Sequence, residues 1–273
     1  MPVKITDKIT IGGGDLVIIA GPCMAESLEI CMETGRFLKS LCEELGLGYI
    51  FKSSYDKANR SSESTVRGPG RMVGLGILQE VKNELKVPVI TDVHEVREVA
   101  DAANVADVLQ IPAFLCRQTD LLHAAGETGK AVNIKKGQFM APEDMRGAVE
   151  KVRATGNDRV MLCERGTSFG YHNLVVDMRS LVIMRELGVP VVFDGTHSVQ
   201  LPGGGGNCSG GCREYVRPLV RAAVGVGIDA LFIEVHPDPD HALSDGPNSL
   251  NFKLAETVIK EAKALYEFGR KMQ

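Results

Sequence analysis

The stretch VPVITDVHEVREVADAANVADVLQI at residues 87–111 contains the unit from which the fold is built. Two short apolar runs, at residues 87–91 and 108–111, enclose a segment with helical spacing and many polar residues. A short apolar run between polar segments is typical of a strand that is buried on both faces, and alternation of such strands with helices indicates a parallel sheet. The stretch therefore predicts a strand, a helix and a second strand.

The same alternation continues along the chain, and the number of strands decides the architecture. Six further apolar runs are predicted to be strands, at residues 16–20, 49–52, 131–135, 160–163, 189–193 and 230–234. Eight strand–helix units in about 250 residues match a closed (β/α)8 barrel, the TIM barrel. An open doubly wound sheet usually has five or six strands and a glycine fingerprint after the first, and this chain has no such fingerprint.

The two ends of the chain complete the predicted barrel. Within residues 1–14, the segments 3–6 and 9–11 flank the pair Asp7-Lys8, and this pattern predicts a β-hairpin that closes the N-terminal mouth, the bottom of the barrel. Residues 250–272 have helical spacing and are expected to form the eighth helix. Because we find no linker or repeat, we expect residues 1–273 to form one barrel domain.

Composition limits the classes of partner. The chain has 31 basic and 35 acidic residues, a formal charge of −4, no tryptophan and 5% aromatic residues. This balance would not attract nucleic acid or an anionic membrane, and it offers few stacking platforms for bases. Seven cysteines without a repeating framework, and the lack of an apolar run long enough to span a bilayer, favour a reduced, cytoplasmic protein.

Basic residues gather after the predicted strands, where TIM barrels carry their active sites. The cations at this mouth are Lys52, Lys57, Arg60, Arg117, Lys135 and Arg165. A single one of them is more often a solvated charge than a ligand. Bringing all of them together costs repulsion unless anions compensate, and Arg and Lys both bind phosphate and carboxylate. The pattern favours a pocket for a polyanionic substrate over a merely solvated rim.

A second group of residues has metal-ligand chemistry. Cys23, His197, Glu234 and Asp245 follow the first, seventh and eighth predicted strands, which are neighbours in a closed barrel. A thiolate, an imidazole and two carboxylates suit a divalent transition metal such as Zn, Fe, Mn or Co. Alternatively, Cys23 is a small buried hydrophobic residue and Glu234 pairs with a lysine. Spacing alone leaves both interpretations open, whereas Cys208 and Cys212 are interpreted as incidental loop thiols.

Long motifs cover nearly the whole chain: FKSSYDKANRSS at 51–62, TDVHE at 91–95, QIPAFLCRQTDL at 110–121, NIKKGQF at 133–139, ERGTSFGYHNLVVDMRS at 164–180, FDGTHSVQLPGG at 193–204 and EVHPDPDHALSDGPNSL at 234–250. Together they resemble the 3-deoxy-D-manno-octulosonate 8-phosphate synthase family, which condenses phosphoenolpyruvate with D-arabinose 5-phosphate and water for lipopolysaccharide Kdo biosynthesis. The resemblance implies a transferase. A synthase for another aldose phosphate and a non-catalytic sugar-phosphate sensor are the alternatives, and KANRSS argues for arabinose 5-phosphate.

The resemblance also implies roles for individual residues. It assigns Lys52, Ser54 and Lys57 to the phosphoenolpyruvate carboxylate, Lys135, Gln138 and Arg165 to its phosphate, and Asn59, Arg60 and Ser61 to the sugar phosphate, with Asp92 and His197 also binding substrate. Phe114 and Arg117 would reach across from a neighbouring subunit of a homotetramer. Cysteine at position 23 implies the metal-dependent type, with Cys23, His197, Glu234 and Asp245 as ligands. Lys57, His197, Cys23 and Asp245 are expected to be catalytic, and residues 203–211 to form a lid.

Overall fold

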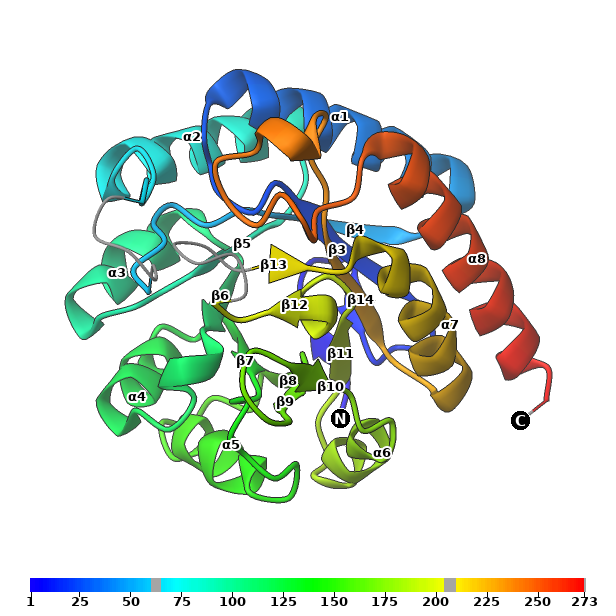
Figure 1. Ribbon diagram of the computed structural model, residues 1–273. Coiled ribbons are helices and arrows are strands. Elements are labelled where there is room, and N and C mark those ends of the chain that lie inside the picture. The colour runs from blue at the N-terminus through cyan, green and yellow to red at the C-terminus, as the bar shows by residue number, and fades with distance from the viewer. Residues whose placement is uncertain (60–64, 204–209, 273) are drawn as a thin grey trace.

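A closed parallel barrel forms the centre of the computed structural model, which describes residues 1–59, 65–203 and 210–272 (Figure 1). Within these residues the barrel has eight strands: β3 (Val17–Gly21), β4 (Gly48–Lys52), β5 (Val89–Asp92), β6 (Val108–Ile111), β7 (Ala131–Lys135), β8 (Val160–Glu164), β11 (Val191–Asp194) and β14 (Ala230–Glu234). β14 pairs with both β11 and β3, and this pairing closes the barrel. The predicted TIM barrel is confirmed.

Two strands begin two residues later than the sequence pattern predicts. β5 and β11 start after Pro88 and Pro190, although the apolar runs begin at residues 87 and 189. Proline has no backbone N–H to donate to a strand ladder, so strands tend to begin beyond it. The carbonyl of each proline still accepts a hydrogen bond from the neighbouring strand, from Phe51 N at 2.9 Å and from Leu162 N at 3.0 Å.

The described part of the chain has eight α-helices, which form a ring around the barrel (Figure 1). They are α1 (Leu28–Leu45), α2 (Arg71–Leu85), α3 (Val96–Val105), α4 (Thr119–Glu127), α5 (Met145–Arg153), α6 (Arg179–Glu186), α7 (Val216–Val226) and α8 (Phe252–Arg270). Asn251 caps α8 by accepting a hydrogen bond from Leu254 N, and the predicted last helix is confirmed. No helix among the described residues is long and apolar enough to cross a membrane.

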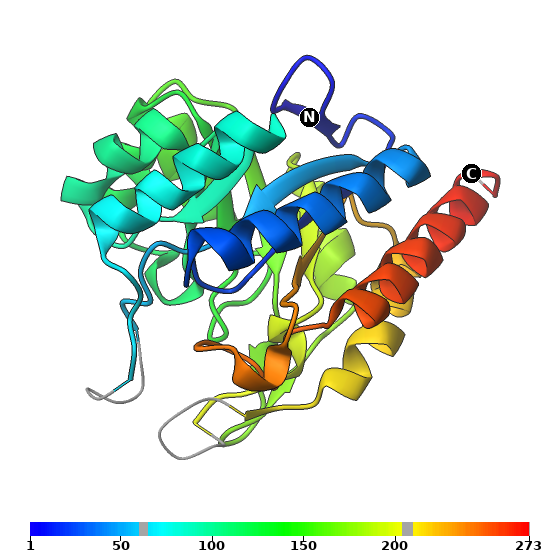
Figure 2. The same ribbon diagram turned by 90° about the horizontal axis from the view of Figure 1, so that it is seen from above.

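Short strand pairs and 3-10 turns lie at the two ends of the barrel. The strand pairs are β1 (Val3–Lys4) with β2 (Thr10–Ile11), β9 (Thr167–Ser168) with β10 (Leu174–Val175), and β12 (Gln200–Leu201) with β13 (Gly210–Gly211). Four 3-10 turns, η1 (Ala113–Leu115), η2 (His197–Val199), η3 (Arg213–Tyr215) and η4 (Pro239–His241), occur in loops of the described chain. Figure 2 shows the β1–β2 hairpin at one end of the barrel and η4 at the other.

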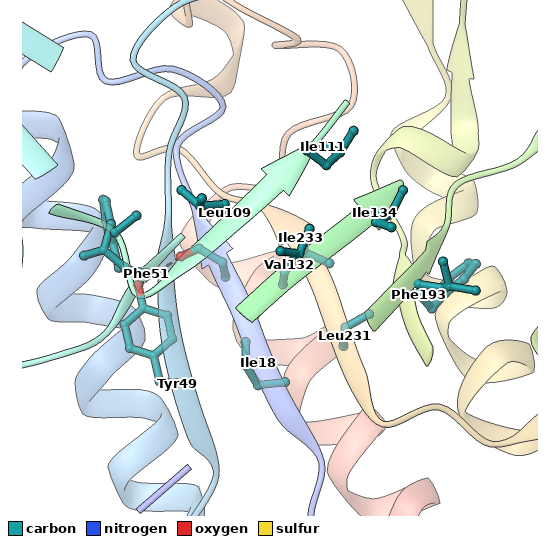
Figure 3. Close-up of a cluster of buried hydrophobic side chains, with 14 of the residues drawn as sticks. Ile18, Tyr49, Phe51, Leu109, Ile111, Val132, Ile134, Phe193, Leu231 and Ile233 are labelled. Atoms are coloured by element: carbon teal, nitrogen blue, oxygen red, sulfur yellow. Dashed lines mark hydrogen bonds between the residues drawn. The ribbon is translucent and has the colours of Figure 1, made fainter. Parts of the chain in front are cut away.

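Side chains alternate along each strand between the helices and the barrel interior. The outward set, which includes Ile18, Phe51, Leu109, Val132 and Phe193, packs in one buried cluster with the helices (Figure 3). The inward set forms a second apolar cluster in the lower barrel, and Val3, Ile5 and Ile11 of the hairpin belong to it. The hairpin therefore closes the bottom of the barrel, as predicted.

Shortening Ile11 tests this apolar plug. Ile11 is fully buried against the barrel interior, so Ile11→Val should lower the free energy of unfolding by about 1 kcal/mol, the usual cost of deleting one buried methyl group. Urea unfolding measures this change. Ile183→Val, on the half-buried face of α6, is the matched control and should cost less. Equal losses at both positions would contradict a tightly packed hairpin.

Polar residues replace apolar ones toward the upper end of the interior. Lys52, Asp92, Lys135, Asp194 and Glu234 are the last residues of β4, β5, β7, β11 and β14, and all five are buried. The lower layer excludes water and the upper layer carries charge. The fold thus places a group of buried ionised side chains at the carboxyl ends of the strands.

Candidate active site at the carboxyl ends of the strands

A cavity of about 500 Å³ opens above this charged layer. The predicted site residues that line it are Lys57, Asn59, Asp92, Phe114, Lys135, Gln138, Arg165, His197 and Asp245. Cys23, Ser54 and Glu234 are buried and contact lining residues directly, and Lys52 is buried against Ser54 and Glu234. Arg117 does not line the cavity and is exposed. Arg60 and Ser61, like most of the predicted lid at 203–211, lie outside the described residues.

Lys52 is at the centre of one polar network. Its Nζ lies 3.1 Å from Ser54 Oγ, 3.3 Å from the Cys23 carbonyl oxygen and 3.4 Å from Glu234 Oε1. The Ser54 hydroxyl in turn donates to Asp92. The β3 backbone can approach β4 this closely because position 21 is glycine: a Cβ there would lie 2.1 Å from the Lys52 carbonyl oxygen.

Lys135 is at the centre of a second network. Its Nζ lies 2.8 Å from Asp194 Oδ2 and 4.3 Å from the centroid of the Phe232 ring. Asp194 Oδ2 is also 2.8 Å from His197 Nδ1. Burial alone would raise the pKa of Asp194, but the charges of His197 and Lys135 hold that pKa well below its ordinary value. Asp194 is therefore an ionised group that fixes both the lysine and the imidazole.

Lys57 brings a further positive charge to the cavity wall. Burial opposes its ionisation, but the fields of Cys23, Glu234, Asp92 and Asp245 outweigh burial and raise its pKa. An ammonium group with a raised pKa stays charged at neutral pH. The wall is therefore cationic at Lys57, Lys135 and Arg165, which suits anionic groups of a small molecule.

Three predicted metal ligands come together below the cavity. One possible ligand atom from each of Cys23, Glu234 and Asp245 lies within 4.8 Å of the others. Cys23 Sγ is 3.1 Å from Asp245 Oδ2 and 3.0 Å from Ser244 Oγ. Glu234 Oε2 is buried and has no hydrogen-bond partner among the described residues. A buried carboxylate oxygen without a donor, beside a thiol and a second carboxylate, fits a divalent cation.

Electrostatics and backbone geometry agree with such a site. Burial, together with the nearby charge of Glu234, raises the pKa of the Cys23 thiol, so a cation is needed to make the thiolate stable. Asp245 has a φ of 49°, a left-handed conformation that is uncommon for residues other than glycine. Its carbonyl oxygen accepts hydrogen bonds from Asn248 N and Ser249 N, which hold the strained loop in place.

His197 lies beside these three residues, and each of its two ring nitrogens faces a carboxylate. Its Nε2 is 3.7 Å from Glu234 Oε1, and its Nδ1 is occupied by Asp194. A carboxylate on the second ring nitrogen is the usual partner of a metal-binding histidine, because it fixes the orientation and tautomer of the ring. The geometric group that we identify contains Cys23, Glu234 and Asp245, with His197 next to it.

Several site residues were missed by the sequence analysis. Asp194 ends an apolar strand three residues before His197, a position that could have identified it. Gln200 contacts both Arg165 and Asp245, at 2.9 Å in each case, but an uncharged amide in a loop gives no signal of its own. Gln110 donates to Asp92 and accepts from Asn133 at 2.9 Å, and its polar side chain within the apolar run 108–111 could have identified it.

Comparison with known proteins places the chain in a family. The model of the DAHP synthetase I family matches residues 1–268. The chain belongs to this family. Family members with the name 2-dehydro-3-deoxyphosphooctonate aldolase include a protein of Syntrophotalea carbinolica that is 59% identical over 264 residues, 96% of this chain and 95% of the relative. A protein of Trichlorobacter lovleyi with the same name is 58% identical over 259 residues, 94% of this chain and 95% of the relative.

A third family member with this name, from Legionella pneumophila, is 56% identical over 256 residues, 94% of this chain and 93% of the relative. The name is a second one for the synthase family that the sequence motifs resemble, so the predicted family is confirmed. The similarity to these three family members covers 94–96% of this chain.

Proposed function

We propose that this protein condenses phosphoenolpyruvate with D-arabinose 5-phosphate and water, and releases 3-deoxy-D-manno-octulosonate 8-phosphate and phosphate. The observation that carries the proposal is the cavity of about 500 Å³, which has Lys57, Lys135 and Arg165 on its wall and an acidic, thiol-containing group below it. This arrangement occurs in a chain 59% identical to a 2-dehydro-3-deoxyphosphooctonate aldolase. Kdo biosynthesis for lipopolysaccharide is the corresponding role.

The cations suit the two anionic groups of phosphoenolpyruvate. Lys135 and Gln138, at and just after the end of β7, and Arg165, just after the neighbouring strand β8, all line the cavity and would bind its phosphate. Lys52 ends β4, and Ser54 and Lys57 follow it; these three would bind its carboxylate, and the Ser54 hydroxyl is held by Asp92. Binding both ends fixes the enol carbon toward the space where the sugar aldehyde must lie. Such fixation replaces an encounter of free molecules by an oriented reaction.

The proposed reaction forms two bonds and breaks one. C3 of phosphoenolpyruvate bonds to the aldehyde carbon while the aldehyde oxygen gains a proton, and a water oxygen bonds to C2 and loses a proton. Phosphate then leaves with cleavage of its C2–O bond, and the new C2 hydroxyl gives up its proton as its oxygen becomes the ketone oxygen. Charge changes at C2 and at the aldehyde oxygen. Buried cations that are already held by Asp194 and Glu234 can stabilise these changes without reorganising, which is electrostatic preorganisation.

We propose that Cys23, Glu234 and Asp245, together with His197, hold a divalent transition metal, as in the metal-dependent type of this family. Sulfur and nitrogen donors favour Zn, Fe, Mn or Co over Mg, which prefers oxygen ligands alone. When bound, such an ion polarises a coordinated oxygen or lowers the pKa of a coordinated water. Asp194 contributes by keeping Nδ1 of His197 occupied, so that Nε2 faces Glu234.

The sugar phosphate would lie toward Asn59, Arg60 and Ser61. Asn59 and Phe114 line this chain's own cavity, and Phe114 is 54% exposed. Arg117 is exposed on the surface, two residues before α4 begins at Thr119. We propose a homotetramer in which Phe114 and Arg117 of one subunit contribute to the site of its neighbour.

A phosphate-release assay with both substrates tests the proposed function. We expect release with arabinose 5-phosphate, and a kcat/KM at least about 100-fold lower with erythrose 4-phosphate, because the shorter sugar leaves polar groups of the site unpaired. A preference for the four-carbon sugar would contradict the proposal. A rise in Tm with arabinose 5-phosphate and phosphoenolpyruvate, but no phosphate release, would instead indicate a non-catalytic sensor.

A further inference from the structure

Gln200 lies between two parts of the site that the proposed function uses separately. Its Oε1 accepts a hydrogen bond from an Arg165 guanidinium nitrogen at 2.9 Å. Its Nε2 donates to Asp245 Oδ1, also at 2.9 Å. The amide orientation follows from the charges, because the reversed amide would point its NH₂ at a cation and its oxygen at an anion. Gln200 therefore joins the expected phosphate ligand to an expected metal ligand.

The hydrogen bond from Gln200 determines how the two carboxylate oxygens of Asp245 are directed. Oδ1 is bound to Gln200, whereas Oδ2 lies 3.1 Å from Cys23 Sγ. Gln200 thus occupies one carboxylate oxygen and turns the other toward the thiol. Because the Asp245 backbone is in a left-handed conformation with a φ of 49°, the side-chain contacts help to hold an unfavourable geometry.

The short segment 197–200, which contains Gln200, also orients the side chain of Arg165. The Arg165 guanidinium donates to the carbonyl oxygen of His197 at 3.4 Å as well as to Gln200. η2 begins at His197 and β12 begins at Gln200, so the two acceptors are three residues apart. The Ser198 hydroxyl donates to the Asp194 carbonyl oxygen at 2.5 Å, which ties this segment to β11. Arg165 is consequently oriented by the segment that also contacts Asp245.

We infer that Gln200 is a positioning residue that couples the phosphate site at Arg165 to the metal site at Cys23, Glu234 and Asp245. The inference rests on the proposed function, since it takes phosphoenolpyruvate as the phosphate ligand. A metal ion that fixes Asp245 also fixes Gln200 and, through it, Arg165. The phosphate then binds a guanidinium that is already ordered, so its binding does not carry the free-energy cost of ordering that side chain. By linkage, each ligand strengthens the binding of the other by the same factor, about five- to tenfold.

Metal affinity with and without phosphoenolpyruvate tests this coupling. The probe is Zn²⁺ in competition with a chromogenic chelator, so the readout does not depend on turnover. In the unmodified protein, saturating phosphoenolpyruvate should raise Zn²⁺ affinity about five- to tenfold. In Gln200→Met, which keeps the length of the side chain but makes neither hydrogen bond, Zn²⁺ affinity should fall about tenfold, the usual size of an effect from a residue that orients a ligand.

The effect of phosphoenolpyruvate on Zn²⁺ affinity should also disappear in Gln200→Met. Gln200→Asn, which is too short to reach both partners, should lose it as well and provides a second variant if the first is poorly folded. Gln79→Met, on the outer face of α2, is the matched control and should retain the full coupling.

The outcomes separate this inference from the proposed function. Full coupling in both Gln200 variants would overturn the role of Gln200. An unmodified protein that binds phosphoenolpyruvate in calorimetry and releases phosphate, but shows no change in Zn²⁺ affinity, would overturn the coupling and leave the proposed function standing. A protein that does not bind phosphoenolpyruvate at all would overturn both.

Discussion

Replacing Cys23 with serine is expected to lower kcat/KM for phosphate release by about 10³-fold, which corresponds to several kcal/mol of lost stabilisation by the metal. The residual activity should no longer respond to chelators. A serine hydroxyl has nearly the size of the thiol, but it does not supply the soft anionic donor that transition metals select. The measurements are phosphate release before and after chelation and the metal content of the purified variant.

The position of Cys23 makes the substitution specific. The residue follows β3, is 3% exposed, and its sulfur already lies 3.1 Å from Asp245 Oδ2, so no movement of the chain is needed to form the site. Cys31→Ser is the matched control. Cys31 is also a free, buried cysteine, but it lies on α1 in the cluster between the helices and the barrel. This variant should lose some stability and keep its metal.

The opposite result would remove the metal from the proposed function. Normal turnover in Cys23→Ser protein that contains no bound metal would mean that Cys23 is a small buried residue, and that Glu234 serves mainly as the partner of Lys52 at 3.4 Å. The sequence alone left this alternative open. Oε2 of Glu234 argues against it, because an ion pair with Lys52 leaves that oxygen without a donor in the part of the chain that the structure describes.

The barrel could be predicted because its signal is repeated. Each strand is buried on both faces, so it appears as an apolar run wherever it stands, and eight such runs select a closed barrel. The pattern could not give the first residues of β5 and β11, because Val87 and Val189 are as apolar as the residues within the strands. Only the missing N–H of the following prolines distinguishes them.

The site was predicted less completely because a sequence shows charges but not their partners. From the sequence, we expect an anionic substrate to compensate the positive charge of the basic residues. In the structure, part of this compensation comes from the protein: Asp194 pairs with Lys135 at 2.8 Å, and Glu234 with Lys52 at 3.4 Å. These lysines are held rigidly by carboxylates, while Arg165 is held by neutral acceptors and is the better placed to bind an external anion.

A second large effect is expected from Lys136→Met, which should lower the free energy of unfolding by about 3–5 kcal/mol. Lys135 and Lys136 are consecutive, so their side chains point to opposite sides at the end of β7. Lys136 points away from the cavity and is fully buried, with its Nζ 3.5 Å from Glu164 Oε1 and 2.9 Å from Thr167 Oγ1. Methionine fills similar space but leaves the carboxylate without a cation.

Glu164 has other partners that would remain after this substitution. Its Oε1 accepts hydrogen bonds from Arg165 N at 3.0 Å and Gly166 N at 2.7 Å, and its Oε2 accepts from the Ser180 hydroxyl. These neutral donors reduce the free-energy cost of burying the ionised carboxylate, but they do not neutralise its charge. Adding Glu164→Gln to Lys136→Met should therefore recover part of the lost stability, because the double variant no longer buries an unpaired charge.

Denaturant unfolding of the four proteins in this cycle measures the coupling between Lys136 and Glu164. Lys253→Met, on the exposed face of α8, is the matched control and should change stability little. If Lys136→Met is as stable as the unmodified protein, the backbone donors suffice for Glu164, and the ion pair has no stabilising role. If the loss occurs as expected, Lys136 supports the turn that directs Arg165 into the cavity, since Glu164 binds the backbone of that residue.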